Sequence, residues 1–370
     1  MIWLATAAAL CWVTVLLLPW QPWRLRERLE PQAPTAASHN DVRILIPARN
    51  EASLLGATLE AALAQGPGVR VVVVDDQSND ATAAIARAAG SRVRVVAGTP
   101  CPPGWSGKLW ALQQGHQHDP RTLTLLLDAD IRLAPGSLDA LKQRWRLQGD
   151  GLVSVMASLR MSTFWERLLL PAFIYFFRLL YPFALVNRRD SGVAAAAGGC
   201  ILLPTALIDE LELFRRIRGE LIDDCALARE VKSACHPVWL GVSRAISSAR
   251  PAADLKALAV MVRRTAFTQL GRSPTLLLLC TVLMLLVFAL PPWAAVSGGQ
   301  AAVLGVIAWV AMSVSFLPTL HFYGLAPIWA PLLPVIGLLY LLFTWQSAVA
   351  CWSGERAQWR GRTYLTEAHT

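Results

Sequence analysis

Three acidic pairs carry most of the chemistry that this sequence could perform. They are Asp75-Asp76, Asp128-Ala129-Asp130 and Asp223-Asp224. The second pair follows the apolar run Leu123–Leu127, which predicts a buried strand of a parallel sheet. Because side chains alternate along a strand, Asp128 and Asp130 should point to the same side at its carboxyl end, where open α/β sheets place ligands. Two carboxylates there could hold a hard divalent cation, and the cation could bridge a diphosphate.

The residues before this strand predict the elements that position the first two acidic pairs. Apolar, β-branched runs predict strands over Val42–Ile46, Val69–Val74 and Val93–Val96. Helical periodicity between them predicts helices over Ser53–Gln65, Ala81–Ala89 and Leu109–His116. This alternation predicts a doubly wound α/β fold. No Gly-x-Gly-x-x-Gly follows the first strand, which argues against a dinucleotide-binding enzyme.

Two later segments allow both a functional and a purely structural interpretation. The small-residue run 194–200 contains Gly198 and Gly199, which permit close approach of the backbone to a ligand, although tight helix–strand packing explains them equally well. The pair Asp223-Asp224 could simply begin the amphipathic helix that follows it. Its place as the third acidic pair favours a functional role. His116 and His118 lie in a polar stretch that predicts a solvated loop.

Apolar residues are concentrated towards the two ends of the chain, and 55% of its 370 residues are hydrophobic. The charge-free run Ile2–Leu18 predicts an uncleaved N-terminal transmembrane anchor over residues 1–20. A basic juxtamembrane segment and linker follow over 21–41. Its arginines predict that the N-terminus lies outside and that the next domain, 42–270, lies in the cytoplasm.

The C-terminal hydrophobic region, 275–352, contains three candidate spans at about 275–296, 301–320 and 326–350. Divisions are expected at Pro291-Pro292 and around 321–327, and Pro327, Pro331 and Pro334 make the last segment the one most prone to a break. The basic tail, 353–370, carries Arg356, Arg360 and Arg362, which prefer the cytoplasm. Four spans in total would place that tail outside, so the number of spans stays open.

Segment 164–186 is apolar and aromatic but contains Arg167 and Arg178, which make a full span costly. It predicts helices in the membrane interface, or equally a buried core helix. The net charge of +9 comes partly from basic residues beside apolar segments, which favours anionic lipid headgroups over nucleic acid as a partner. The seven cysteines form no Cys-x-x-Cys pair, which indicates a reducing compartment and no structural zinc.

Taken together, the motifs resemble those of a family 2 glycosyltransferase of the GT-A fold. The strand end Val73–Asp80 resembles the family's uridine-binding segment, and Asp128-Ala129-Asp130 resembles its metal-binding motif. The segment Gly107–Leu112 resembles a conserved stretch between these two, and Asp223-Asp224 stands where the family has Glu-Asp. The Gln-x-x-Arg-Trp motif of the wider family is absent, and residues 263–267 occupy that region. Trp105–Trp110, 195–200, 221–228 and 264–270 are also similar to the hopanoid-biosynthesis branch and to ceramide glucosyltransferases.

The resemblance implies transfer of a sugar from a nucleoside-diphosphate sugar, expected in its UDP form, to a membrane lipid at the inner membrane of a bacterial-type cell. It implies that Asp224 is the catalytic base beside Asp223, and that Asp130 and Asp128 hold Mg²⁺ or Mn²⁺. The donor-binding residues expected are Pro47, Arg49, Glu51, Asp75, Asp76, Lys108, Asp128, Arg263 and Arg264. The acceptor region is expected at Gly198, Gly199, Cys200 and Phe267.

Several alternatives remain open on the sequence alone. The acceptor could be polyprenyl phosphate or a sphingolipid-like molecule instead of a hopanoid. The chain could also be an inactive membrane scaffold, although all the expected acidic residues are present. A processive polysaccharide synthase and a transporter are disfavoured by the few predicted spans, and the spans show no clear ionisable site. Sugar, linkage and oligomeric state are not indicated.

Overall fold

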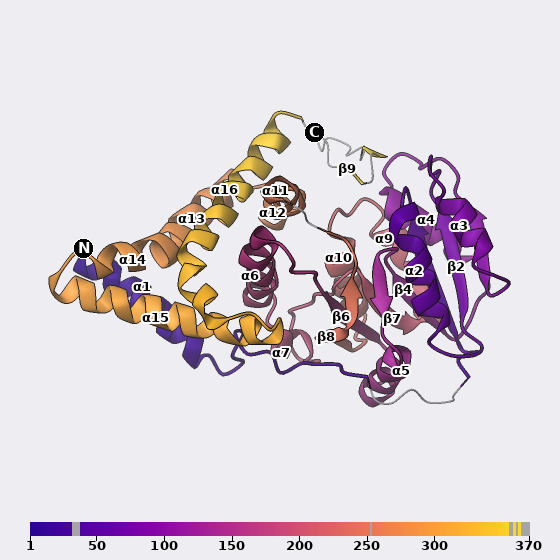
Figure 1. Cartoon of the computed structure of the whole chain (residues 1–370), viewed down its shortest axis with the longest axis horizontal. Helices are drawn as coiled ribbons and strands as arrows, with labels where there is room; N and C mark the ends of the chain where they lie inside the picture. Colours follow the sequence, from indigo (N-terminus) through magenta and orange to yellow (C-terminus); the bar gives the residue numbers. More distant parts are fainter. Residues whose placement is uncertain (32–37, 252–253, 355–357, 360–361, 364–370) are drawn as a thin grey trace. The chain divides into compact units, whose positions relative to one another are not determined.

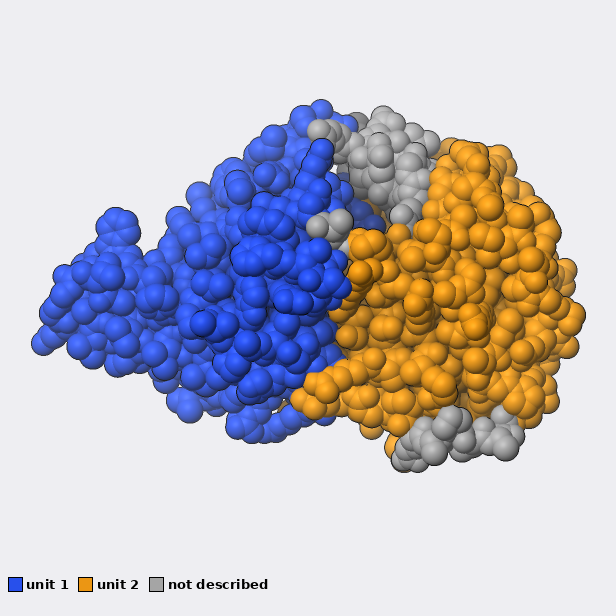
Figure 2. Space-filling model, viewed as in Figure 1, with its two compact units in different colours: residues 1–26, 161–184, 252–355 blue, residues 27–160, 185–251, 356–370 orange. Residues whose placement is uncertain are grey.

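A computed structural model describes residues 1–31, 38–251 and 254–354 of the chain, together with the backbone of 358–359 and 362–363. These residues form two compact units, which Figure 2 colours separately. Unit 1 comprises 1–26, 161–184 and 252–355, and unit 2 comprises 27–160, 185–251 and 356–370. Linker residues 32–37 and the tail residues Arg356 and Arg360 lie outside the described residues.

Unit 2 is built on a sheet that has eight strands among the described residues, in the order β3-β2-β1-β4-β7-β6-β8-β5. Figure 1 labels β2, β4, β6, β7 and β8 of this sheet. The strands are β1 (Val42–Ala48), β2 (Arg70–Asp75), β3 (Val93–Ala97), β4 (Leu123–Leu127), β5 (Ile131–Leu133), β6 (Leu152–Ser158), β7 (Cys200–Pro204) and β8 (Val238–Ser248). Strands β3, β2, β1 and β4 are parallel, as the alternation of strands and helices predicts. Strand β7 is antiparallel to β4 and β6, which makes the whole sheet mixed. A separate antiparallel pair is formed by β9 (Gln358–Trp359) and β10 (Arg362–Thr363).

Helices cover both faces of the parallel half of this sheet. The helices of unit 2 are α2 (Ala52–Leu63), α3 (Thr82–Ala88), α4 (Gly107–His116), α5 (Ser137–Gln148), α8 (Thr205–Glu210), α9 (Leu213–Arg216) and α10 (Asp223–Ser233). Alternate β1 residues such as Ile44 and Ile46 share a core with Leu55 of α2. Leu45, between them, lies against Gly115 of α4 on the other face. This two-sided burial explains why all seven β1 residues are buried.

The close approach of α4 to the sheet depends on Gly115. A Cβ atom at this position would come within 2.5 Å of Val74 Cγ2 and closer still to Leu45 Cδ1. Both neighbours are fully buried, so neither can move without disturbing the core. We expect Gly115→Ala to destabilise the protein by about 1–3 kcal/mol, the usual cost of overpacking.

The measurement is the apparent melting temperature of the detergent-solubilised protein, followed by tryptophan fluorescence. A loss of about 3–9 °C is expected for a unit of this size. Gly56→Ala in α2 is the matched control, because its Cβ would meet only Ile85 at 3.6 Å, an ordinary contact. An equal loss in both variants would contradict the packing argument.

The prediction of a solvated loop for His116 is wrong. His116 ends α4 and is 9% exposed, because it joins a buried network around Arg43 of β1. The Arg43 guanidinium donates to the carbonyl oxygens of His116, at 2.6 Å, and of His118, at 2.8 Å. His116 Nδ1 lies 2.8 Å from Arg43 Nη2, and His116 Nε2 lies 2.6 Å from Asp209 Oδ1. These contacts satisfy a cation that would otherwise be too costly to bury.

Unit 1 contains the apolar helices. They are α1 (Ile2–Leu17), α6 (Phe164–Leu180), α11 (Leu255–Arg263), α12 (Ala266–Gln269), α13 (Pro274–Met284), η1 (Leu285–Ala289), α14 (Leu290–Ala295), α15 (Gly299–Phe322), η2 (Pro327–Leu332) and α16 (Leu333–Trp352). The boundary between the units at residue 184 falls within α7 (Phe183–Val186). Within unit 1, Trp12 of α1 donates a hydrogen bond to the Val287 carbonyl at 2.7 Å. Helix α1, with 16 residues, is shorter than the ~20 residues that usually cross a bilayer.

Three helices among the described residues are long and apolar enough to cross a membrane. They are Pro274–Ala295, Gly299–Phe322 and Pro327–Trp352, which match the three predicted C-terminal spans. The first passes through Pro291-Pro292 by way of the π-helical turn η1, so the division falls at Gly298 and not at the prolines. The expected break in the last segment is not seen, because the helical segment Pro327–Trp352 is continuous. Pro327 and Pro331 lie in the 3-10 helix η2, and Pro334 lies in the first turn of α16, where a missing N–H group costs little.

Helix α6 begins at a capping box formed by Thr163 and Glu166 and packs within unit 1. Tyr340 of α16 donates a hydrogen bond to the Leu169 carbonyl at 2.8 Å, and the Tyr175 and Ser315 hydroxyls lie 2.6 Å apart. Helix α6 therefore belongs with the apolar helices α15 and α16. Its placement in a membrane interface stays a prediction.

Candidate active site

The first acidic pair lies where β1 and β2 end side by side. The Asp76 amide donates to the Ala48 carbonyl at 2.8 Å, which ties the end of β2 to the end of β1. Arg49 donates to the carbonyl oxygens of Asp76, at 2.5 Å, and of Gln77, at 3.0 Å. Asp75 Oδ1 is buried and accepts no hydrogen bond from the described residues. A buried acceptor of this kind fits a ligand that brings an N–H or O–H donor.

The second pair lies in a turn at the end of β4. Strand β4 stops at Leu127, and the Ile131 amide donates to the Asp128 carbonyl at 3.0 Å. The turn, and not the strand alternation that we predicted, therefore positions the two carboxylates. Asp128 Oδ1 lies 3.0 Å from Lys108 Nζ, whereas both oxygens of Asp130 are engaged by residues of the β8 end.

The third pair begins helix α10. Asp224 Oδ2 accepts a hydrogen bond from the Gly198 amide, and Asp224 Oδ1 accepts one from the Cys225 amide, both at 2.8 Å. Asp223 Oδ2 lies 3.2 Å from Lys108 Nζ. Burial, and then the negative charge of Asp223, raise the pKa of Asp224 to about 6. A carboxylate with this pKa can accept a proton near neutral pH.

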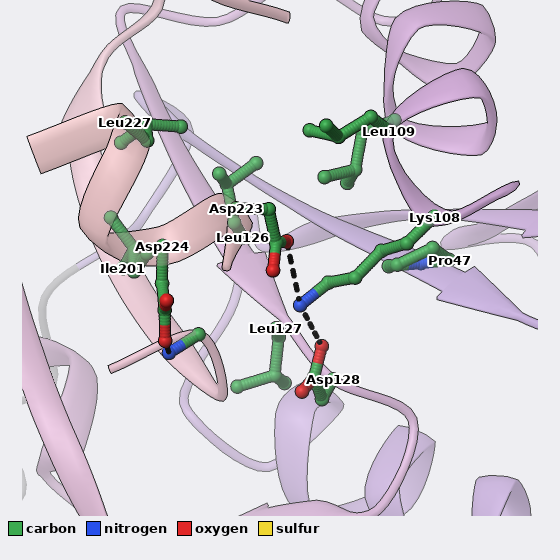
Figure 3. A pocket seen from close by; sticks show the side chains of 12 residues that line it. Pro47, Lys108, Leu109, Leu126, Leu127, Asp128, Ile201, Asp223, Asp224 and Leu227 are labelled. Carbon is green, nitrogen blue, oxygen red and sulfur yellow. Dashed lines mark hydrogen bonds and ion pairs between the residues drawn. The ribbon is translucent and has the colours of Figure 1, made fainter. Parts of the chain in front are cut away.

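Lys108 joins the second and third pairs. Figure 3 shows its side chain reaching between Asp128 and Asp223. Burial works against the ammonium ion, but the charges of Asp128, Asp223 and Asp224 outweigh it and raise the Lys108 pKa. Lys108 is placed there because Ser106 caps α4, its side chain accepting a hydrogen bond from the Leu109 amide.

A shallow pocket opens beside these charged groups (Figure 3). Its lining includes Pro47, Lys108, Asp128 and the pair Asp223-Asp224. Its remaining lining is formed by Gly198 and by the apolar side chains of Leu109, Leu112, Leu126, Leu127, Ile201 and Leu227. The pocket therefore combines carboxylates, one ammonium ion and an apolar wall.

The small-residue run brings its backbone against the third pair. A Cβ atom at Gly198 would lie 3.2 Å from Lys108 Nζ and 3.3 Å from Asp224 Oδ2. Gly198 therefore lets the chain approach both charged groups. A Cβ at Gly199 would lie 3.1 Å from Ile131 Cδ1. Cys200 is fully buried, and burial raises the pKa of its thiol to about 12, so it is a neutral core side chain.

Sequence reasoning did not include Arg250. Its Nη2 atom lies 2.7 Å from Glu51 Oε1 and 3.2 Å from Asp130 Oδ1. Burial raises the pKa of Glu51, while Arg250 acts against that rise. The only sequence signal for Arg250 is a basic residue before a proline at the end of an apolar strand, which is weak.

The remaining predicted residues belong to unit 1. Arg263 ends α11 and Arg264 follows it, and the Ser347 hydroxyl of α16 donates to the Arg263 carbonyl. The Phe267 amide donates to Ser347 Oγ at 3.1 Å, and the Phe267 side chain is 2% exposed. Phe267 thus packs within unit 1 against α16. Donor or acceptor contacts of these three residues stay predictions.

Comparison with known proteins gives a family match over most of the chain. The family model described as Glycosyltransferase like family 2 matches residues 39–268. A curated relative, the 4,4'-diaponeurosporenoate glycosyltransferase of Staphylococcus aureus (strain MRSA252), is 37% identical over 120 residues. The same enzyme of strain bovine RF122 / ET3-1 is 36% identical over 120 residues. Each alignment spans 32% of this chain and only 32% of the relative.

A solved structure shares the fold over nearly the whole chain. It is the mannosyltransferase PcManGT from Pyrobaculum calidifontis, in complex with GDP-Man and Mn²⁺. The TM-score is 0.54 at 17% sequence identity, and the match covers 93% of this chain and 99% of that one. At this identity, the likeness describes the fold alone.

Proposed function

Because the chain belongs to glycosyltransferase-like family 2, we propose that it transfers a sugar from a nucleoside-diphosphate sugar to a membrane lipid. The observation that carries the proposal is the meeting of Asp128, Asp223 and Asp224 around Lys108 in one pocket. A transferase needs a place for a diphosphate and a base for the acceptor within reach of each other. This pocket offers a cation and carboxylates for both.

The donor nucleoside would bind at the ends of β1 and β2. Asp76, with Asp75 beside it, would accept hydrogen bonds from the base or ribose, and Arg49 holds the Asp76 carbonyl in place. The buried Asp75 Oδ1 atom supports this assignment. Pro47 lines the pocket, and Glu51 holds Arg250. Lys108 would contact the diphosphate, because an ammonium ion matches phosphate oxygens. UDP is the nucleotide that the motif Val73–Asp80 favours.

A divalent cation fits the acidic pair in the turn after β4. Among the described residues, no group of three or more histidine, cysteine or acidic side chains could hold a metal on its own. Mg²⁺ is commonly held by one or two carboxylates together with substrate phosphates, and Asp128 and Asp130 provide that number. When bound, Mg²⁺ or Mn²⁺ would offset the charge that develops on the departing diphosphate. The PcManGT complex contains Mn²⁺.

Asp224 would accept the proton of the acceptor hydroxyl as that oxygen attacks the anomeric carbon. The bond from the anomeric carbon to the diphosphate oxygen breaks at the same time, so a single displacement inverts the anomeric centre. The Gly198 and Cys225 amides hold both Asp224 oxygens and orient the carboxylate. Asp223 would act through Lys108 as a positioning residue.

This assignment predicts the pH dependence of the reaction. The base must be ionised, and Asp224 has a pKa of about 6. We therefore expect kcat/KM to rise with pH through a midpoint near 6 and to fall about tenfold per pH unit below it. The profile is measured in detergent with saturating metal. A flat profile between pH 5 and 8 would contradict the assignment.

A lipid acceptor is supported by the three apolar helices in unit 1 and by the name of the S. aureus relatives. We place the protein in the inner membrane of a bacterial-type cell as a multi-pass protein, with residues 42–270 on the cytoplasmic side where nucleotide sugars occur. A hopanoid-related alcohol is the leading acceptor, because four segments resemble that branch. The relatives' acceptor is named as a carboxylate, so an apolar carboxylate is the second candidate.

The experiment is a lipid-transfer assay with membranes that contain the full-length protein. Labelled UDP-sugars or GDP-mannose, Mn²⁺ and either hopanoid or total bacterial lipid are supplied, and label in the organic phase is counted. Mass analysis of the product identifies the acceptor. Metal-dependent transfer supports the proposal. No transfer from any donor to any lipid, by a folded protein, would contradict it.

A further inference from the structure

The residues at the end of β8 bring the guanidinium group of Arg250 into contact with Asp130, the proposed metal ligand. Ser248 lies opposite Ile131 in the antiparallel β5–β8 pair, and the Ala249 amide donates to the Asp130 carbonyl at 2.9 Å. These contacts bring Arg250 to Asp130 from a distant part of the chain. Pro251 comes next and favours an extended conformation at Arg250.

Both oxygens of Asp130 are engaged in this arrangement. The Ser248 hydroxyl donates to Asp130 Oδ2 at 2.6 Å, and Arg250 Nη2 lies 3.2 Å from Asp130 Oδ1. The same Arg250 nitrogen lies 2.7 Å from Glu51 Oε1. Glu51 is 6% exposed, and its amide donates to Thr82 Oγ1 at 2.8 Å, so it is a fixed anchor at the start of α2.

We propose that Arg250 is a resident counter-ion of Asp130 that a divalent cation must displace, and that this displacement couples metal binding to donor binding. The inference rests on the proposed function, because it takes Asp130 as a metal ligand. A divalent cation held by Asp130 would repel a guanidinium group that contacts the same carboxylate oxygen.

The anchor at Glu51 determines where Arg250 lies once the metal has displaced it. Arg250 stays near the site because Glu51 holds it, and the N–H groups that leave Asp130 would be available to the oxygens of a bound diphosphate. A guanidinium group matches phosphate oxygens bidentately. When the metal binds alone, Arg250 therefore loses its ion pair with Asp130 and gains no new partner. When the metal binds with a nucleoside diphosphate, the phosphate oxygens become the new partner of Arg250. The two ligands should bind cooperatively, typically by a factor of about 5–150.

The test is Mn²⁺ binding, measured by the loss of the free-ion EPR signal with full-length protein in detergent. For wild type, we expect weak binding of Mn²⁺ alone and tighter binding when UDP or GDP is added. Arg250→Gln should bind Mn²⁺ alone about tenfold more tightly, and the enhancement by nucleotide should shrink to less than about threefold. Asp130→Asn should lose the site.

Two further variants separate this effect from a general change of charge or fold. Arg244→Gln removes the same charge from an exposed position on the same strand and should leave Mn²⁺ affinity at the wild-type value. Arg250→Lys keeps the positive charge and should also keep Mn²⁺ alone weakly bound. Melting temperatures identify any variant that fails to fold.

The outcomes distinguish the inference from the function on which it rests. If Arg250→Gln bound Mn²⁺ no more tightly than wild type, while Asp130→Asn lost the site, the inference would be wrong and the proposed function would stand. If wild type bound no Mn²⁺ with or without UDP or GDP, the metal-dependent function and the inference would both be wrong.

Discussion

Replacing Asp224 with asparagine is expected to lower kcat for lipid glycosylation about 10³-fold, within the range for loss of a general base. Asparagine keeps the size of the side chain but cannot take the acceptor proton. Donor binding should change little, because Asp224 contacts the Gly198 and Cys225 amides and not the ends of β1 and β2. The measurements are single-turnover transfer of labelled sugar to lipid and, separately, nucleotide affinity.

Asp223→Asn is the matched control for this variant. It removes a neighbouring negative charge that helps to raise the pKa of Asp224, so the midpoint of the pH profile should move below 6. It also removes one contact of Lys108, so a moderate loss of rate, about tenfold, is expected from poorer positioning. A larger loss of kcat in Asp223→Asn than in Asp224→Asn would mean that Asp223, and not Asp224, is the catalytic base.

The same pair of variants discriminates between the two acceptor candidates. A hydroxyl must lose its proton as it attacks, whereas a carboxylate is already ionised at neutral pH. With a carboxylate acceptor, Asp224→Asn should lower kcat by less than about tenfold. The size of this effect, together with the product mass, therefore identifies the chemical class of the acceptor.

Asp130→Asn is the second change with a large expected effect. Loss of a carboxylate ligand should abolish Mn²⁺ binding and lower kcat/KM about 10³-fold, because metal stabilisation of a leaving diphosphate contributes several kcal/mol. Activity is measured as a function of Mn²⁺ concentration. Saturating metal should not rescue the variant, because neither neighbour of Asp130, Arg250 or Ser248, has a carboxylate that could take its place as a metal ligand.

Ser248→Ala is the control for Asp130→Asn. It removes the 2.6 Å hydrogen bond to Asp130 Oδ2 but keeps the carboxylate, so metal dependence should persist with a loss of less than about tenfold. If Asp130→Asn kept wild-type activity and metal response, Asp130 would not be a metal ligand. Asp128 alone would then have to be tested in that role.

Local patterns predicted the parallel half of the sheet well. The run Leu123–Leu127 gave the bounds of β4, and β1, β2 and β3 were placed to within two residues at each end. The three apolar C-terminal helices were also predicted closely. These elements can be predicted from the sequence because burial on both faces of a strand, or around a whole helix, requires a continuous apolar run.

Elements whose structure depends on residues distant in the sequence were not predicted. Strands β5, β6 and β8 were missed, and β5 has only three residues that become a strand by pairing with β8. His116 looked solvated because its neighbours are polar, yet Arg43 and Asp209 enclose it from other parts of the chain. In each case a tertiary contact overrode the local pattern.

The sequence by itself determined the three acidic pairs, their order along the chain and the parallel strands that end at the first two. The tertiary structure decided which charges neutralise which. Lys108 lies between Asp128 and Asp223, and Arg250 lies between Glu51 and Asp130. The physical reason is that a periodic pattern reports burial along one segment, whereas an ion pair depends on the distance between side chains that only chain packing brings together.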